Sequence, residues 1–174
     1  MEEITVYILK DMDLKGATVI NGFPTAGLVS AITANYLIGT LKLDQIAFLD
    51  SLEFPPVSMI YDNKPKFPAR IYGDEKAKLV IFLSEFTPLI NLIRPLADTV
   101  FDFVDKNQCS NIIAPEAMPA RGETLEVFGV GSTDSARAKI SELGIKPISY
   151  GVITGIPGVM LNEGRKRDFD VRSP

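Results

Sequence analysis

Residues 16–41 read GATVINGFPTAGLVSAITANYLIGTL, and this stretch decides the fold. It contains no Asp, Glu, Lys or Arg, although charged residues make up 23% of the chain. Residues 17–20 form a short apolar run that suits a buried strand, and residues 21–24 form a turn cluster. Thr25 suits the N-cap of a helix over residues 26–41. Because apolar side chains lie nearly all round that helix, we expect it to be buried on more than one side.

The glycine loop of this stretch, residues 22–27 (GFPTAG), has two interpretations. A glycine loop that opens a helix presents backbone N–H groups and a positive dipole end, which suit an anion. Alternatively, Gly22 and Gly27 serve only a tight turn and close contact between helix and strand. The spacing is neither the G-x-G-x-x-G of dinucleotide sites nor that of a P-loop. The second interpretation is therefore favoured.

Composition narrows the classes of function. The 174 residues fit a single domain, residues 1–174, with room for a substantial core. The chain has no histidine and one cysteine, Cys109, which removes the Ser-His-Asp triad, an internal disulfide and the commonest metal ligands. A net charge of −4 disfavours a nucleic-acid partner. We expect no cofactor, although carboxylates could still hold Mg²⁺.

The beginning of the chain indicates where the protein works. Glu2 and Glu3 stand where a signal peptide carries basic residues, and no apolar segment follows them. Gly22 and Pro24 interrupt the uncharged stretch before it reaches the roughly 20 apolar residues that span a membrane. We therefore expect a cytoplasmic protein that has no membrane partner.

The remaining pattern alternates strands and helices. Expected strands cover residues 4–9, 17–20, 46–49, 57–61, 69–72, 79–83, 111–114, 125–130 and 148–153. Expected helices cover residues 26–41, 89–106, 133–143 and 159–166. We expect a hairpin between residues 57–61 and 69–72, and a parallel crossover from residues 17–20 to 46–49. The last residues begin like a further strand, which is either a short edge strand or the start of a missing part.

Candidate ligand-binding residues follow the expected strands. Glu85 comes directly after residues 79–83, and sites in open α/β sheets gather at the carboxyl ends of strands. The alternative is that Ser84 or Thr87 caps the next helix while Glu85 interacts with the helix dipole. Other residues are expected at the same sheet edge, and none forms a catalytic constellation. The full set of candidates is Gly22, Pro24, Gly27, Glu53, Glu85, Arg121 and Gly155.

Six segments in order resemble a known family. They are GFPTAGLV with YLI (residues 22–38), DSLEFPP (50–56), PARIY (68–72), LSE (83–85), EVFGVGS (126–132) and GVITGIPGVMLNE (151–163). Together they resemble the type-2 proteasome assembly chaperones, including archaeal members. The resemblance implies a mixed sheet flanked by helices, like that of the purine nucleoside phosphorylases. It also implies homo-oligomers that assist the assembly of proteasome α-subunits without catalysis.

The chain departs from this family at two places. Ala114, Pro115 and Glu116 stand where family members usually have glycines. The family also continues beyond the position of Val171 with a strand and helices, so the resemblance implies a shortened C-terminus. Archaeal members can end in a hydrophobic-Tyr-any tail that docks into α-subunit pockets. This chain ends in Arg-Ser-Pro after Val171, so docking by that route is not expected.

Two hypotheses of different class follow. The first is a non-enzymatic interaction protein that acts as a homo-oligomer, with proteasome α-subunits as partners. The second is a small-molecule-binding protein or enzyme that uses a phosphorylase-like pocket at the strand ends. A polar pocket that brings Glu53, Glu85 and Arg121 together would favour the second hypothesis. A flat apolar face shared across a symmetric interface would favour the first.

Overall fold

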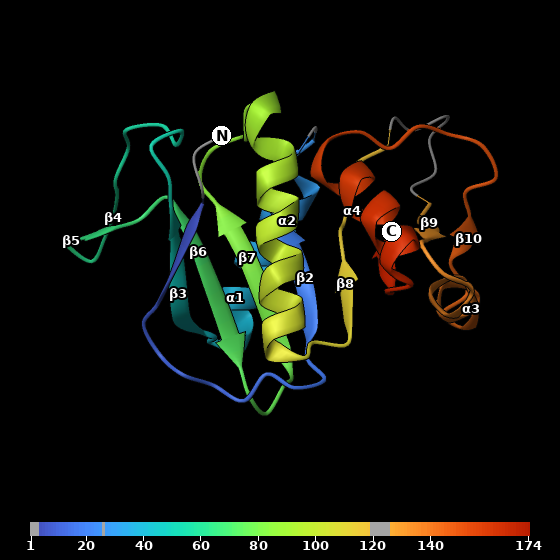
Figure 1. The fold of residues 1–174 in the computed structure, drawn as a ribbon, viewed down its shortest axis with the longest axis horizontal. Coiled ribbons are helices and arrows are strands. Elements are labelled where there is room, and N and C mark those ends of the chain that lie inside the picture. Colours follow the sequence, from blue (N-terminus) through green and yellow to red (C-terminus); the bar gives the residue numbers. More distant parts are fainter. Residues whose placement is uncertain (1–3, 26, 119–125) are drawn as a thin grey trace.

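The computed structural model describes residues 4–25, 27–118 and 126–174. The helices are α1 (Val29–Leu41), α2 (Ile90–Asn107), α3 (Asp134–Glu142) and α4 (Gly155–Arg167). The strands are β1 (Thr5–Ile8), β2 (Thr18–Gly22), β3 (Asp44–Asp50), β4 (Met59–Tyr61), β5 (Lys64–Lys66), β6 (Ala69–Asp74), β7 (Leu79–Ser84), β8 (Asn111–Ile113), β9 (Phe128–Gly131), β10 (Lys146–Pro147) and β11 (Val171–Ser173). Figure 1 shows their arrangement.

A single large sheet organises these elements. It has nine strands in the order β1-β3-β6-β7-β2-β8-β11-β9-β10, while β4 and β5 form a separate hairpin. The central strands β7, β2, β8 and β11 are parallel, and β6, β3 and β1 continue from β7 in antiparallel order. The expected α/β class, a mixed sheet flanked by helices, is confirmed. The crossover from β2 to β3 joins strands of the same direction, but β7 and β6 lie between them.

Helices cover both faces of the sheet (Figure 1). Helices α2 and α4 pack against each other on one face and enclose the larger core, which includes Phe82, Phe101 and Phe103. Helix α1 lies on the other face over β2 and β7, above a smaller core that contains Ile20 and Ile81. Strand β2 thus separates two apolar layers, which explains why its sequence is apolar without a polar face.

The predicted helices over residues 89–106 and 133–143 are confirmed as α2 and α3, and local features explain where they lie. Helix α2 occupies nearly the predicted range and contains Pro95. Thr133 caps α3 by accepting a hydrogen bond from the Ala136 N–H at 2.9 Å. Gly144 follows the C-cap of that helix with a φ of +69°, a conformation that favours glycine. These signals depend on nearby residues, so the sequence alone is sufficient to predict them.

The predictions for α1 are wrong in two respects. The helix begins at Val29, and its N-cap is Leu28, whose φ is +57° and whose side chain makes no capping bond, so Thr25 is not the cap. The helix also buries only Ser30 and Ala34, although we expected burial on more than one side. The missing charges therefore do not reflect burial by the described residues of this chain.

Three strand predictions are also wrong. Strand β4 pairs with β5 and not with residues 69–72, because Asp62 and Asn63 adopt φ values of +49° and +60° and close a two-residue turn. Residues 148–153 form no strand, and the Tyr150 and Val152 side chains are 97% and 87% exposed. Strand β11 lies between β8 and β9, so it is not an edge strand.

Two further observations concern the reactivity of Cys109 and the presence of membrane-spanning helices. Cys109 is buried, and burial raises the pKa of its thiol to about 11, so the thiol stays protonated at neutral pH, as expected for a structural cysteine. Among residues 4–25, 27–118 and 126–174, no helix has the length and apolar content that crossing a bilayer requires.

Candidate functional site

The carboxyl ends of the central strands surround a small cavity of about 120 Å³. Pro24 and Thr25 follow β2, Thr87 and Pro88 follow β7, and Glu116 follows β8. The N-terminus of α4 completes the cavity with residues 154–156. The cavity therefore lies where sites occur in open α/β sheets, although typical ligand pockets measure about 300–1,000 Å³.

Glu116 is the ionisable residue of this cavity. Its Oε2 atom is buried without a hydrogen-bond partner among the described residues, and the Ala117 N–H donates to Oε1 at 3.2 Å. Burial raises the pKa of Glu116, while hydrogen bonds from Thr25 and from the Ala117 backbone partly oppose the shift. Sequence analysis missed this residue, although its position three residues after the end of an apolar strand was a usable signal.

We expect Glu116→Gln to raise the melting temperature at neutral pH. The raised pKa means that the folded state disfavours the carboxylate, and the neutral amide removes that penalty. Below the ordinary glutamate pKa, Glu116 is protonated in both states, so the gain should fall toward zero between pH 7 and about pH 4. Thermal unfolding of both proteins over this pH range measures the effect. A gain that does not change with pH would contradict this explanation.

The glycines of the loop have steric roles. A Cβ atom on Gly22 would lie 2.5 Å from both the Ala34 Cβ and the Phe82 carbonyl oxygen, so Gly22 lets α1 approach β2. Gly27 has a φ of +77°, and a Cβ there would lie 2.6 Å from the Ala117 Cβ. This geometry agrees with the structural interpretation of the loop, in which glycines permit close contact.

Glu85 does not line the small cavity and belongs to an ionic cluster with Arg70. It forms an ion pair with Arg70, and the Tyr61 hydroxyl donates to Glu85 Oε1 at 3.0 Å. The Arg70 side chain is 2% exposed, and its Cζ atom lies 5.3 and 5.9 Å from the ring centres of Tyr61 and Tyr72. The N-cap of α2 is Leu89, so the alternative in which Ser84 or Thr87 caps this helix is wrong. Glu85 thus neutralises a buried arginine.

The candidates do not form one cluster. Pro24 and Gly155 line the cavity. Glu53 accepts a hydrogen bond from Asn91 Nδ2 at 2.9 Å, and Glu85 is engaged by Arg70. Arg121 lies outside the described residues. Ligand binding by the seven candidates stays a prediction.

A second surface was missed by sequence analysis. Leu28, Val29, Ile32 and Tyr36 form an exposed apolar row on α1, which we call the α1 stripe. The side chains of Leu28, Ile32 and Tyr36 are 51%, 63% and 68% exposed and recur every four residues, so they share one side of the helix. The uncharged composition signalled this surface, but burial within the chain was the simpler explanation.

Comparisons with known proteins give the family. A model described as the PAC2 family matches residues 19–173. The structure of Pyrococcus furiosus PbaA, described as an archaeal homolog of proteasome-assembly chaperone, is 27% identical with a TM-score of 0.87, covering 98% of this chain and 74% of PbaA. A Thermoplasma acidophilum protein of unknown function is 27% identical with a TM-score of 0.80, covering 91% of this chain and 66% of that one.

A third structure shows the same fold. Pyrococcus furiosus PbaB, described as an archaeal proteasome activator, is 23% identical with a TM-score of 0.79, covering 99% of this chain and 79% of PbaB. No curated protein sequence matches this chain. The family model covers most of the chain and the fold agrees with its structures, so this chain belongs to the PAC2 family.

Proposed function

We propose that this protein is a non-enzymatic interaction protein of the proteasome-assembly-chaperone type, acting as a cytoplasmic homo-oligomer. The α1 stripe is the observation that carries the proposal, because it is an apolar surface that no described residue covers. The partners proposed besides the protein itself are proteasome α-subunits. Support for them comes from PbaA, a 27% identical relative described as a homolog of proteasome-assembly chaperone.

The chemistry of α1 favours a second copy as the occupant of the stripe. In a two-fold interface each residue meets an equivalent surface, so charged residues near the axis would face like charges. Residues 16–41 carry no charge, which avoids this repulsion. Two antiparallel α1 helices could cross at Ile32 and Tyr36 and also oppose their dipoles favourably.

The described residues also support one domain as the working unit. Strand β1 begins at Thr5 and β11 ends at Ser173, yet both belong to the same nine-stranded sheet. We therefore infer that residues 1–174 act as a single domain in both self-association and partner binding.

We expect Ile32→Glu to weaken self-association by at least about tenfold, because it places two buried carboxylates at the symmetric interface. Native mass spectrometry and light scattering over a concentration series measure the effect. Ile90→Glu is the matched control, because Ile90 is also a helical isoleucine and is 89% exposed. A wild-type protein that stays monomeric, or equal effects of both variants, would contradict self-association through α1.

Mixing the protein with proteasome α-subunits from the same cell tests whether α-subunits are its partners. A defined complex in native mass spectra would support the chaperone role, and its persistence in Ile32→Glu would separate partner binding from self-association. Self-association without any α-subunit complex would remove α-subunits as the partner and leave the homo-oligomer standing.

The alternative function is small-molecule binding or catalysis at the strand ends. Its support is the Glu116 carboxyl. One of its oxygens is buried without a hydrogen-bond partner among the described residues, and this burial lowers stability. A carboxyl that lowers stability is typical of residues retained for binding. A thermal-shift screen with small metabolites would support this alternative if a compound stabilises the wild type and not Glu116→Gln.

A further inference from the structure

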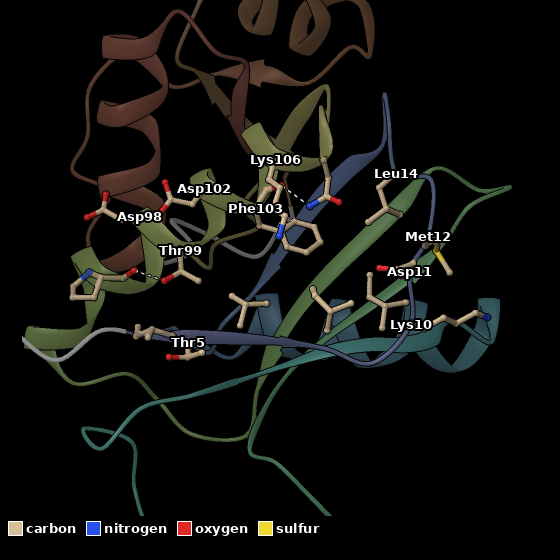
Figure 2. Close-up of a pocket in the computed structure, with 16 residues that line it drawn as sticks. Thr5, Lys10, Asp11, Met12, Leu14, Asp98, Thr99, Asp102, Phe103 and Lys106 are labelled. Atoms are coloured by element: carbon tan, nitrogen blue, oxygen red, sulfur yellow. Dashed lines mark hydrogen bonds between the residues drawn. The ribbon is translucent and has the colours of Figure 1, made fainter.

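A larger groove lies between β1 and α2, on the face of the sheet opposite α1 (Figure 2). Its volume is about 780 Å³, which falls within the range of ligand-binding pockets. Strand β1 forms one wall and α2 forms the other, while the segment after β1 closes one end. Nothing in the proposed self-association through the α1 stripe uses this groove.

The backbone of β1 is open toward another strand. Strand β1 is an edge of the sheet and pairs only with β3 among the described strands. The Leu9 N–H donates to the Ile46 carbonyl at 2.8 Å, so odd-numbered positions face β3. Because antiparallel strands alternate the direction of their polar groups, the N–H and C=O groups of Val6 and Ile8 point away from β3.

These outward groups have no partner in the described part of the chain. Outside the pairing with β3, the backbone of Val6 and Ile8 makes no hydrogen bond to the described residues. Both residues also line the groove, so the free edge of β1 borders its interior. An open edge with regularly spaced donors and acceptors is a template for one more strand.

The inner surface of the groove suits apolar side chains. Leu14, Ile46 and Phe103 are buried residues that line it, and Met12 is half-buried beside them. Side chains of an added strand alternate in direction, so every second one would face this surface.

Charged residues at the groove determine which charge a bound segment should carry. Asp98 and Asp102 lie one turn apart on α2 and are exposed, and no ion pair among the described residues uses them. Lys10 is already paired with Asp44, which leaves Lys106 as the cation at this wall. The α2 wall therefore favours a basic side chain near Asp98 and Asp102.

We propose that this groove binds an extended peptide segment of another protein. The segment adds as a strand to the free edge of β1. Its side chains at alternate positions face the groove, where apolar ones lie beside Val6 and Ile8 and a lysine or arginine turns toward Asp98 and Asp102. A second folded copy fits less well, because its own β1 edge lies beside its own α2. A flexible terminus or loop of a partner has no such obstruction.

The test uses the full chain with a labelled, amidated lysine–valine peptide of seven residues, in which valine, lysine and valine at the second, fourth and sixth positions share one face and threonine fills the other positions. We expect saturable binding by fluorescence anisotropy, with shifts of the Val6 and Ile8 amide signals in NMR spectra. Val6→Pro removes an outward N–H without touching the β3 ladder, and proline is tolerated at such edge positions. It should weaken binding by at least about tenfold while thermal stability stays close to that of the wild type.

Charge is tested separately. Asp98→Asn with Asp102→Asn should weaken binding at low salt by about tenfold, and added salt should reduce this difference. The matched control is Asp62→Asn with Asp168→Asn, which removes two exposed carboxylates outside the groove and should bind like the wild type. A peptide with glutamate in place of lysine should bind at least tenfold more weakly than the lysine peptide.

Three results would overturn the proposal. They are no saturable binding of the lysine–valine peptide, unchanged binding by Val6→Pro, and equal binding of the glutamate peptide. Concentration-dependent shifts of the β1 amides without peptide would assign the groove to a second copy instead. These measurements require neither α-subunits nor the α1 stripe, so their failure is distinct from failure of the proposed function.

Discussion

Replacing Gly22 by alanine is expected to lower the free energy of unfolding by about 3 kcal/mol, at the upper end of the cost of overpacking a core. The added Cβ would lie 2.5 Å from the Phe82 carbonyl oxygen and 2.5 Å from the Ala34 Cβ. The first contact is with the backbone of β7 and the second with a fully buried residue of α1. Neither group can shift without disturbing the packing around it. Chemical denaturation followed by circular dichroism measures the change.

Gly39→Ala provides the matched control within the same region. Gly39 lies inside α1, and a Cβ there would meet no atom within 4 Å. Alanine favours a helix interior over glycine by about 0.5–1 kcal/mol, so this variant should be more stable than the wild type. Equal stability changes at the two positions would show that backbone entropy and not close packing explains Gly22.

This pair of glycines illustrates what the sequence can predict about α1 and β2. The run of apolar residues, the glycine loop and the helix were all evident, because each depends on neighbours in the chain. The exposure of Ile32 and Tyr36 was not evident. Hydrophobic periodicity reveals the exposed side of a helix only where polar residues occupy that side. A helix without charges can be buried within its chain or between chains, and the sequence does not distinguish them.

Long-range strand pairing explains the other errors. Residues 171–173 enter the sheet between β8 and β9, and no local signal contains that information. The β4–β5 hairpin depends on Asp62 and Asn63 adopting positive φ values, which are uncommon for residues other than glycine. The pattern therefore predicted α/β architecture, while the order of strands required the structure.

The candidate site was predictable only in its location. Pro24 and Gly155 do line a cavity at the carboxyl ends of strands, as the general rule for open α/β sheets predicts. The partners of Glu85 and Glu53 could not be predicted, since Arg70 and Asn91 come from other elements. The burial of Glu116 could not be predicted either, because residues that follow β2 and β7 and the N-terminus of α4 enclose it.

Glu85→Gln is expected to lower the free energy of unfolding by about 3 kcal/mol, the lower end of the cost of leaving a buried charge unpaired. Arg70 is 2% exposed, and Glu85 is its charged partner among the described ion pairs. The remaining contacts of Arg70 are a hydrogen bond to the Phe67 carbonyl at 3.1 Å and the rings of Tyr61 and Tyr72. They do not supply a negative charge, so the guanidinium would stay buried and uncompensated.

A double variant separates loss of the pair from the cost of burying it. Arg70→Met with Glu85→Leu removes both charges together, and such apolar replacements are often neutral or stabilising, so most of the loss should be recovered. Glu142→Gln is the control, because it breaks an ion pair with Lys139 that is exposed on both sides and should cost less than about 1 kcal/mol. If the double variant is as unstable as Glu85→Gln, the contacts of the Arg70 side chain with Tyr61 and Tyr72, and not its charge balance, explain the loss of stability.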